Sequence, residues 1–172
     1  QKQQAVVEQF EVTRDNKILA LCPGAEYGPA KQWPAEHYAE LAKQKIAQGW
    51  TVFIFGSKKD KAVSEKINQL ADNACHDFSG KTSLAEAVDL MSLAEVVVTN
   101  DSGLMHVAAA LNKKVIAIYG SSDPKFTPPL NNSAKVINLN LDCSPCFKRE
   151  CPLGHTRCLT EILPAQILAE IN

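Results

Sequence analysis

The chain has 172 residues, of which 45% are hydrophobic and 22% charged, so it has the composition of one globular domain rather than of a disordered or fibrous chain. Eighteen Lys and Arg against 19 Asp and Glu give a formal net charge of −1, which excludes nucleic-acid binding by bulk positive charge, so no nucleic-acid partner is expected. No apolar run approaches the ~18 residues of a membrane-spanning helix.

Residues 1–17 precede the first clear structural signal. They are polar and weakly periodic, with a short helix expected over 6–11, and the chain begins at Gln1 rather than at Met. We therefore interpret residues 1–17 as a linker or short helix from a preceding domain, and residues 18–172 as a domain of their own.

From residue 18 the chain alternates between apolar runs and amphipathic stretches. Continuous apolar runs predict strands that are buried on both faces, and i, i+3, i+4 spacing predicts helices. In chain order we expect a strand at 18–22, a helix at 34–49, a strand at 51–55, a helix over 63–71, a strand at 76–78, a helix over 84–91, a strand at 95–99, a helix at 104–111, strands at 115–119 and 135–139, and a helix at 164–171. Ser83 and Glu86 form a capping box, and Leu70 and Leu84 are expected on buried helix faces.

This alternation predicts an α/β fold: a doubly wound, Rossmann-like parallel sheet with helices on both faces. The expected strand order is 3-2-1-4-5-6, which reverses between the first and fourth strands. Ligands of such sheets bind beyond the carboxyl ends of the strands at that reversal. Loops 23–33 and 100–106 should therefore face each other across a crevice, flanked by loops 56–60 and 120–126.

The segment from Thr99 to His106 carries the strongest chemical signal. It joins the fourth strand to a helix, where free backbone N–H groups and the helix dipole favour an anion such as a phosphate. Asp101, Ser102 and Gly103 fall at this junction, and Gly103 lets a ligand approach the backbone. His106 lies away from the apolar stripe of the helix, which argues against a core role. The alternative is that Asp101 or Ser102 only caps the helix.

Two further loops hold charged candidates. Lys31 precedes the helix that starts at Pro34, where it would neutralise a pyrophosphate or else be a solvated loop residue. Asp60 follows the second strand, where it would accept hydrogen bonds from ribose hydroxyls or else cap the helix at Lys61. The glycines of loop 23–34 do not form G-x-G-x-x-G, which weakens the case for a nicotinamide dehydrogenase.

The six cysteines fall into two groups. Cys22 and Cys75 are isolated and are expected to be core thiols. The other four lie within 16 residues as C-x2-C-x4-C-x6-C, in which only the first pair has the spacing of zinc ligands: Cys143, Cys146, Cys151 and Cys158. A structural zinc site, free thiols, and one or two disulfides all remain open for this cluster.

Taken together, the loop motifs resemble one known family. Residues 22–25 (CPGA), 29–34 (PAKQWP), 55–60 (FGSKKD), 100–106 (NDSGLMH) and 119–120 (YG) are similar, in order and spacing, to the C-terminal half of the ADP-heptose:lipopolysaccharide heptosyltransferases of glycosyltransferase family 9. The resemblance runs from about residue 18 to the C-terminus. It implies the donor-binding domain of a two-domain GT-B glycosyltransferase.

The resemblance also implies a role for each candidate residue. Lys31 would contact the pyrophosphate of the donor, and Asp60 would contact the adenosine ribose. Asp101 would hydrogen-bond hydroxyl groups of the heptose. The Ser102–Gly103 pair would lie against the phosphates, and His106 would support that corner of the site.

The activity that the resemblance implies is transfer of heptose from ADP-heptose to the inner core of lipopolysaccharide, at the cytoplasmic face of the bacterial inner membrane. The lipid-A inner-core acceptor and the catalytic base are expected on an N-terminal domain that is absent here. No catalytic residue is therefore assigned to this chain, and the chain alone is expected to be inactive. Peripheral membrane contact would belong to the full-length enzyme, and no cofactor is required. The alternatives are a generic nucleotide-binding module and half of a sugar-nucleotide epimerase.

If the four clustered cysteines hold zinc, the purified chain should contain about one equivalent of metal by elemental analysis, because thiolates at such a site bind zinc as part of folding. Protein prepared without chelator that contains no zinc would contradict the zinc hypothesis. Thiol titration under denaturing conditions would then separate free thiols from disulfides.

Overall fold

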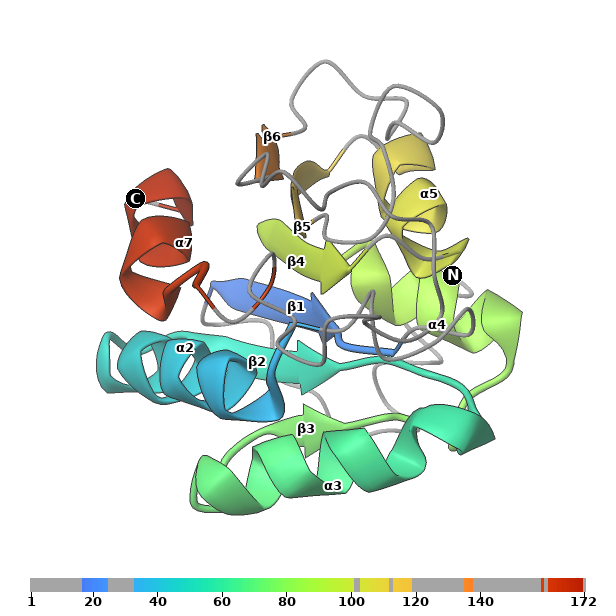
Figure 1. The fold of residues 1–172 in the computed structure, drawn as a ribbon. Coiled ribbons are helices and arrows are strands. Elements are labelled where there is room, and N and C mark those ends of the chain that lie inside the picture. The colour runs from blue at the N-terminus through green and yellow to red at the C-terminus, as the bar shows by residue number, and fades with distance from the viewer. Residues whose placement is uncertain are drawn as a thin grey trace, which may run out of the picture.

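A parallel sheet forms the centre of the computed structural model, which describes residues 17–24, 33–100, 103–111, 113–118, 135–137, 159 and 161–171 (Figure 1). Within these residues the sheet has six strands in the order β3-β2-β1-β4-β5-β6, and every pair is parallel. The strands are β1 (Ile18–Cys22), β2 (Thr51–Ile54), β3 (His76–Asp77), β4 (Val96–Asn100), β5 (Lys114–Ile118) and β6 (Lys135–Ile137). This order confirms the prediction and places the reversal between β1 and β4.

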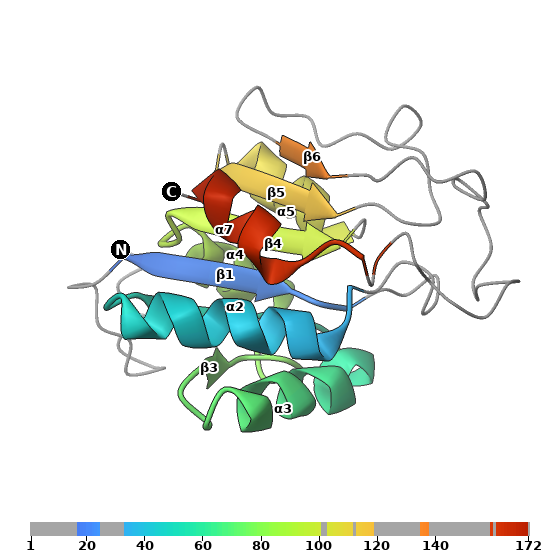
Figure 2. The same ribbon diagram turned by 60° about the vertical axis from the view of Figure 1, so that its left-hand side comes forward.

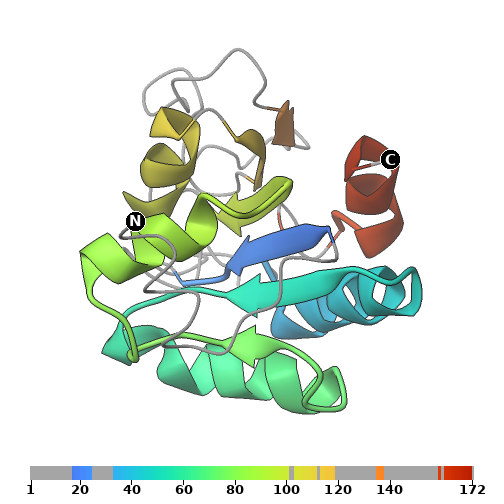
Figure 3. The same ribbon diagram turned by 180° about the vertical axis from the view of Figure 1, so that it is seen from behind.

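Helices cover both faces of the sheet. They are α2 (Ala35–Ala47), α3 (Lys61–Leu70), α4 (Leu84–Met91), α5 (Gly103–Ala110) and α7 (Pro164–Ile171). Helices α2, α3 and α7 cover one face of the sheet (Figure 2), and α4 and α5 cover the other, which Figure 3 shows from behind. Their buried side chains form two separate cores with the strands. None of the helices in the described ranges combines the length and the apolar character that a bilayer crossing requires.

The central strand β1 contributes to both cores. Leu19 and Leu21 belong to the core beneath α2, whereas Ala20 and Cys22 belong to the core beneath α4 and α5. Because side chains of a strand alternate between the two faces, an apolar run such as 18–22 is what a sheet covered on both faces requires. All five residues of β1 are buried.

The predicted elements agree closely with the observed ones. The strand at 18–22 and the helix at 164–171 have the predicted bounds, and the strands predicted at 95–99 and 115–119 are shifted by one residue, to 96–100 and 114–118. The edge strand β3 is shorter than predicted, with two residues, and it pairs with a single neighbour, so fewer backbone hydrogen bonds extend it. The last predicted strand, at 135–139, is described over residues 135–137, where it forms β6.

The start of α4 and the end of α2 are formed by the capping residues that the sequence predicts. The Ser83 hydroxyl accepts from the Glu86 N–H at 3.1 Å, and the Ser83 N–H donates to the Glu86 carboxylate at 2.9 Å, which confirms the capping box of α4. Gly49 follows α2 with φ of +88°, a left-handed conformation that glycine adopts without a steric penalty.

Two leucines are exposed where the spacing predicts burial, so that expectation is wrong for both. Leu70 ends α3 and is 42% exposed because Ile67 and Ala71 occupy the positions that face the sheet. Leu84 begins α4 and is 67% exposed. Its side chain lines a pocket at the end of the sheet instead of packing on the strands.

Candidate functional site

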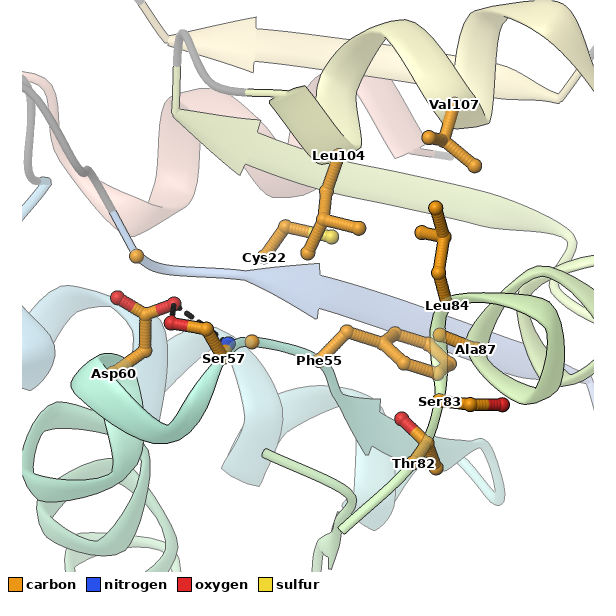
Figure 4. A pocket seen from close by; sticks show the side chains of 12 residues that line it. Cys22, Phe55, Ser57, Asp60, Thr82, Ser83, Leu84, Ala87, Leu104 and Val107 are labelled. Atoms are coloured by element: carbon orange, nitrogen blue, oxygen red, sulfur yellow. Dashed lines mark hydrogen bonds between the residues drawn. The ribbon is translucent and has the colours of Figure 1, made fainter. Parts of the chain in front are cut away.

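A pocket of about 450 Å³ opens beyond the carboxyl ends of β1 and β2 (Figure 4). It is bounded by residues that follow these two strands, by the start of α4 and by α5. The pocket lies beside the reversal between β1 and β4, where doubly wound sheets bind ligands. Its volume falls within the roughly 300–1,000 Å³ of small-molecule sites.

Asp60 forms the polar end of the pocket. Its Oδ2 atom accepts hydrogen bonds from the Ser57 backbone N–H at 2.8 Å and from the Ser57 hydroxyl at 3.1 Å (Figure 4). These bonds close a capping box on the short 3₁₀ helix η2 (Lys58–Asp60). Asp60 makes no side-chain capping bond to α3. Asp60 therefore occupies the N-cap position of α3, as the alternative predicts, but its carboxylate bonds Ser57 and does not cap that helix.

Two glycines leave room for this carboxylate. A Cβ atom on Gly24 would lie 2.3 Å from Cγ of Asp60, and one on Gly56 would lie 2.8 Å from Cβ of Asp60. Neither contact is sterically possible, so a larger residue at either position would displace the acidic side chain. Gly24 and Gly56 each lie two residues beyond the end of β1 or β2, which are neighbouring strands. The sheet thus brings both glycines against Asp60.

The rest of the pocket is largely apolar. Phe55 lines it and is only 1% exposed, Leu84 extends into it from α4, and Leu104 and Val107 line it from α5. Figure 4 shows the Leu84 side chain directed from α4 toward Val107. Thr82 adds a hydroxyl group. Aliphatic walls with a few polar groups suit a flat ring that carries hydrogen-bonding edges.

Cys22 also lines the pocket, but its thiol is unreactive. Burial raises the pKa of its thiol to about 12, and a hydrogen bond with Thr99 lowers the pKa by less. The thiol is therefore protonated at neutral pH and is not a nucleophile. Burial likewise raises the pKa of Cys75 to about 12. Both cysteines are free and buried, as predicted.

A buried amide connects the strand reversal to the pocket. Asn100 ends β4 with no exposed surface. Its Oδ1 accepts from the Trp33 N–H at 3.1 Å and from the Tyr38 hydroxyl at 2.7 Å. Its Nδ2 donates to the carbonyl oxygens of Pro23 at 2.7 Å and Gly24 at 3.4 Å. All four hydrogen-bonding positions of the amide are used.

The Asn100 bonds hold the loop after β1 and the start of α2 in one arrangement. The amide oxygen needs donors and the amide nitrogen needs acceptors, so the side chain has one favourable orientation. Burial raises the pKa of Tyr38 well above its usual value, so its hydroxyl stays protonated and donates. Trp33 is tied further by its ring N–H, which donates to the Ile162 carbonyl at 2.8 Å.

The structure brings part of the predicted site together. Asp60 and Leu104 line the same pocket, so the loop after β2 and the helix start after β4 meet at one crevice, as predicted. His106 is exposed on α5, whereas Met105 and Ala108 are buried, which confirms that His106 lies outside the core. His106 does not line the pocket.

Other candidates lie outside the described residues. Gly103 is the first residue of α5, but residues 101 and 102, which precede it, are not described. Among the residues that the structure does describe, no group of three or more His, Cys, Asp or Glu side chains could hold a metal ion. The candidates not described, together with the helix expected at 6–11 and the loop at 120–126, are Lys31, Asp101, Ser102, Cys143, Cys146, Cys151 and Cys158.

Three residues that form or support the pocket are not singled out by the sequence. Ser57 is one serine of a loop, Leu84 is one leucine of a helix face, and Asn100 is the residue before Asp101. A serine three residues before Asp60 has the spacing of a capping box, which was a usable signal. No comparable local signal marks Leu84 or Asn100.

The chain is similar to known proteins over nearly its whole length. Residues 1–157 match the family described as glycosyltransferase family 9 (heptosyltransferase). Over 95% of the chain it is 45% identical to lipopolysaccharide heptosyltransferase 2 of Escherichia coli K12, of which it covers 48%. Over 96% of the chain it is 44% identical to lipooligosaccharide heptosyltransferase 2 of Haemophilus influenzae, of which it covers 49%.

Solved structures agree with the sequence comparison. The structure of E. coli ADP-heptose lps heptosyltransferase II matches 99% of this chain with a TM-score of 0.86 and 41% identity. The matched region is 50% of that protein. The chain therefore spans about half the length of the relatives that it matches.

Replacing the buried amide should weaken the whole fold. We expect Asn100→Ala to lower the free energy of unfolding by about 2–4 kcal/mol, because it leaves buried donors and acceptors without partners. Tyr38→Phe removes one donor and leaves the Trp33 N–H on Oδ1, so its cost should be about 1 kcal/mol. Urea unfolding measures both values. A cost for Asn100→Ala no larger than that for Tyr38→Phe would contradict the anchoring role.

The space that Gly24 and Gly56 leave for the Asp60 carboxylate, here called the glycine slot, predicts that removing this carboxylate relieves the cost of a larger residue at Gly24. Gly24→Ala should lower the free energy of unfolding by about 1–3 kcal/mol, since its Cβ overlaps the Asp60 carboxylate. In an Asp60→Ala background the three nearest clashing atoms are absent, so the same Gly24→Ala change should cost much less. Urea unfolding of the four proteins tests this. An equal cost in both backgrounds would show that Asp60 is not what fills the slot.

Proposed function

Because the chain belongs to glycosyltransferase family 9, the heptosyltransferases, we propose that it binds the sugar-nucleotide donor, ADP-heptose, of a lipopolysaccharide heptosyltransferase. Both relatives described above are named as heptosyltransferases of lipopolysaccharide or lipooligosaccharide. They favour this interpretation over a generic nucleotide-binding module or half of a sugar-nucleotide epimerase.

The pocket at the strand reversal carries the proposal. Asp60 lies at one end, where its carboxylate would accept hydrogen bonds from the ribose hydroxyls. Leu84 and Leu104 lie on the apolar side, where they would contact the two faces or the edge of the adenine ring. The exposure of Leu84 supports this role, because a 67% exposed leucine at a pocket has apolar surface to bury on binding.

The phosphates would lie toward the start of α5. This helix begins at Gly103 directly after the strand reversal, and its first N–H groups favour an anion. Lys31 would add a positive charge from the loop between β1 and α2. Asp101 would bind heptose hydroxyls, Ser102 would lie against the phosphates and His106 would support them from α5.

The chemistry requires a good leaving group and an activated acceptor. As the bond between the anomeric carbon and the phosphate oxygen breaks, ADP leaves and the sugar carbon gains positive charge. Lys31 and the α5 N-terminus would stabilise the negative charge that develops on the pyrophosphate. Protein charges would supply this stabilisation, so the proposed mechanism uses no catalytic metal.

The acceptor would bind the other half of a full-length enzyme, because this chain covers only about half the length of its relatives. There a base would remove the proton from the attacking hydroxyl of the lipid-A inner core. The product would be heptose linked to that core, formed at the cytoplasmic face of the bacterial inner membrane. Any peripheral contact with the membrane would belong to this full-length enzyme.

The Lys31 charge gives a direct test of donor binding. Lys31→Ala should weaken ADP-heptose binding to the chain by about 10- to 150-fold in isothermal titration calorimetry, the equivalent of a hydrogen bond to a charged group. Adenosine, which lacks phosphates, should bind both proteins equally. Lys43 is exposed on α2, so Lys43→Ala is a matched loss of one lysine and should leave binding unchanged.

Donor preference decides between the proposed function and its alternatives. ADP-heptose should bind the unsubstituted chain more tightly than ADP or ATP. Equal binding of all adenine nucleotides would favour the generic nucleotide-binding module. If Lys31→Ala leaves the ADP-heptose affinity unchanged, Lys31 is a solvated loop residue and does not contact the donor.

A further inference from the structure

Both hydrogen-bond donors of Ser57 meet a single oxygen of Asp60. The backbone N–H lies 2.8 Å and the hydroxyl 3.1 Å from Oδ2. The hydroxyl also accepts from the Lys59 N–H at 3.2 Å, which directs its own proton toward the carboxylate. A carboxylate oxygen has about two acceptor positions. Ser57 therefore occupies the acceptor positions of Oδ2 and leaves the acceptor positions of Oδ1 for another donor.

The glycine slot limits how this carboxylate can move. Carboxyl atoms of Asp60 lie 2.3–2.5 Å from where a Cβ on Gly24 would be, and Gly56 borders the same side chain. The acidic group is thus enclosed by backbone on two sides and held by Ser57 on a third. Within the described part of the chain its hydrogen bonds all go to Oδ2, which leaves Oδ1 for a ligand at the polar end of the pocket that Asp60 lines.

From this arrangement we propose that Ser57 is a positioning residue for the donor ribose. By holding Oδ2, it presents Oδ1 alone to the ligand, where two acceptor positions match the two hydroxyls of a 2′,3′-diol. The site would then select ribonucleoside diphosphates over their 2′-deoxy forms. This inference rests on the proposed donor-binding function and concerns a residue that does not itself contact the ribose.

Selectivity between two ligands is the measurement that separates positioning from stability. The probes are ADP and 2′-deoxy-ADP, bound to the 172-residue chain in isothermal titration calorimetry. Ser57→Ala removes the hydroxyl and keeps the backbone N–H, so ADP should bind about 3- to 10-fold more weakly, the range of one neutral hydrogen bond. Binding of 2′-deoxy-ADP should change less, so the ratio of the two affinities should shrink. Ser57→Thr keeps a hydroxyl and should restore both values.

A double-mutant cycle tests whether Ser57 acts through Asp60. In an Asp60→Ala background, Ser57→Ala should have no further effect on ADP affinity, because the group that it positions is gone. A persistent effect in that background would show that Ser57 contacts the nucleotide directly and would overturn the positioning role.

The second capping box supplies the control. Glu86 caps the start of α4 from outside the pocket lining, so Glu86→Ala breaks a comparable motif. It should lower the unfolding midpoint and leave the ratio of ADP to 2′-deoxy-ADP affinity unchanged. A ratio that shifts equally in Glu86→Ala and Ser57→Ala would overturn the proposal in favour of general loosening.

The outcome also distinguishes this inference from the function on which it rests. An unsubstituted chain that binds neither nucleotide overturns the proposed donor site and the positioning role together. A chain that binds ADP, with a ratio unaffected by Ser57→Ala, overturns the positioning role alone and leaves the donor site intact.

Discussion

The buried amide of Asn100 is the interaction on which the site depends. It ends β4, the strand next to β1 at the reversal of strand order. Its four hydrogen bonds join the loop after β1, at Pro23 and Gly24, to the start of α2, at Trp33 and Tyr38. A buried amide that lost these partners would cost more than the bonds contribute, so this arrangement has one favourable form.

A chain of contacts links Asn100 to the polar end of the pocket. Gly24, whose carbonyl accepts from Asn100, borders the carboxylate of Asp60, and Ser57 holds that carboxylate from the far side. Three neighbouring strands, β4, β1 and β2, thus position one acidic group through Asn100 at the end of β4 and the loops that follow β1 and β2. A site supported in this way loses little freedom when a ligand binds, which favours affinity and selectivity.

The chemistry of the described pocket is that of recognition rather than proton transfer. Cys22 is held as a neutral thiol by burial, and Asp60 is engaged by Ser57. Apolar side chains from α4 and α5 make up much of the remaining wall. This fits the proposed division, in which the present chain would bind the donor and the other half of a protein of the relatives' length would activate the acceptor.

The sequence by itself determined the order of elements, the strand order and the edge of the sheet that carries the site, because apolar periodicity and parallel connections are local signals. It also identified Asp60 as a residue of that edge. Only the tertiary structure decided that the Asp60 carboxylate lies against Gly24 and bonds Ser57 rather than the backbone of α3, that Leu84 lines a pocket, and that Asn100 bonds Tyr38 across 62 residues. These contacts depend on strand register and on how loops pack above neighbouring strands, and local spacing along the chain does not encode either.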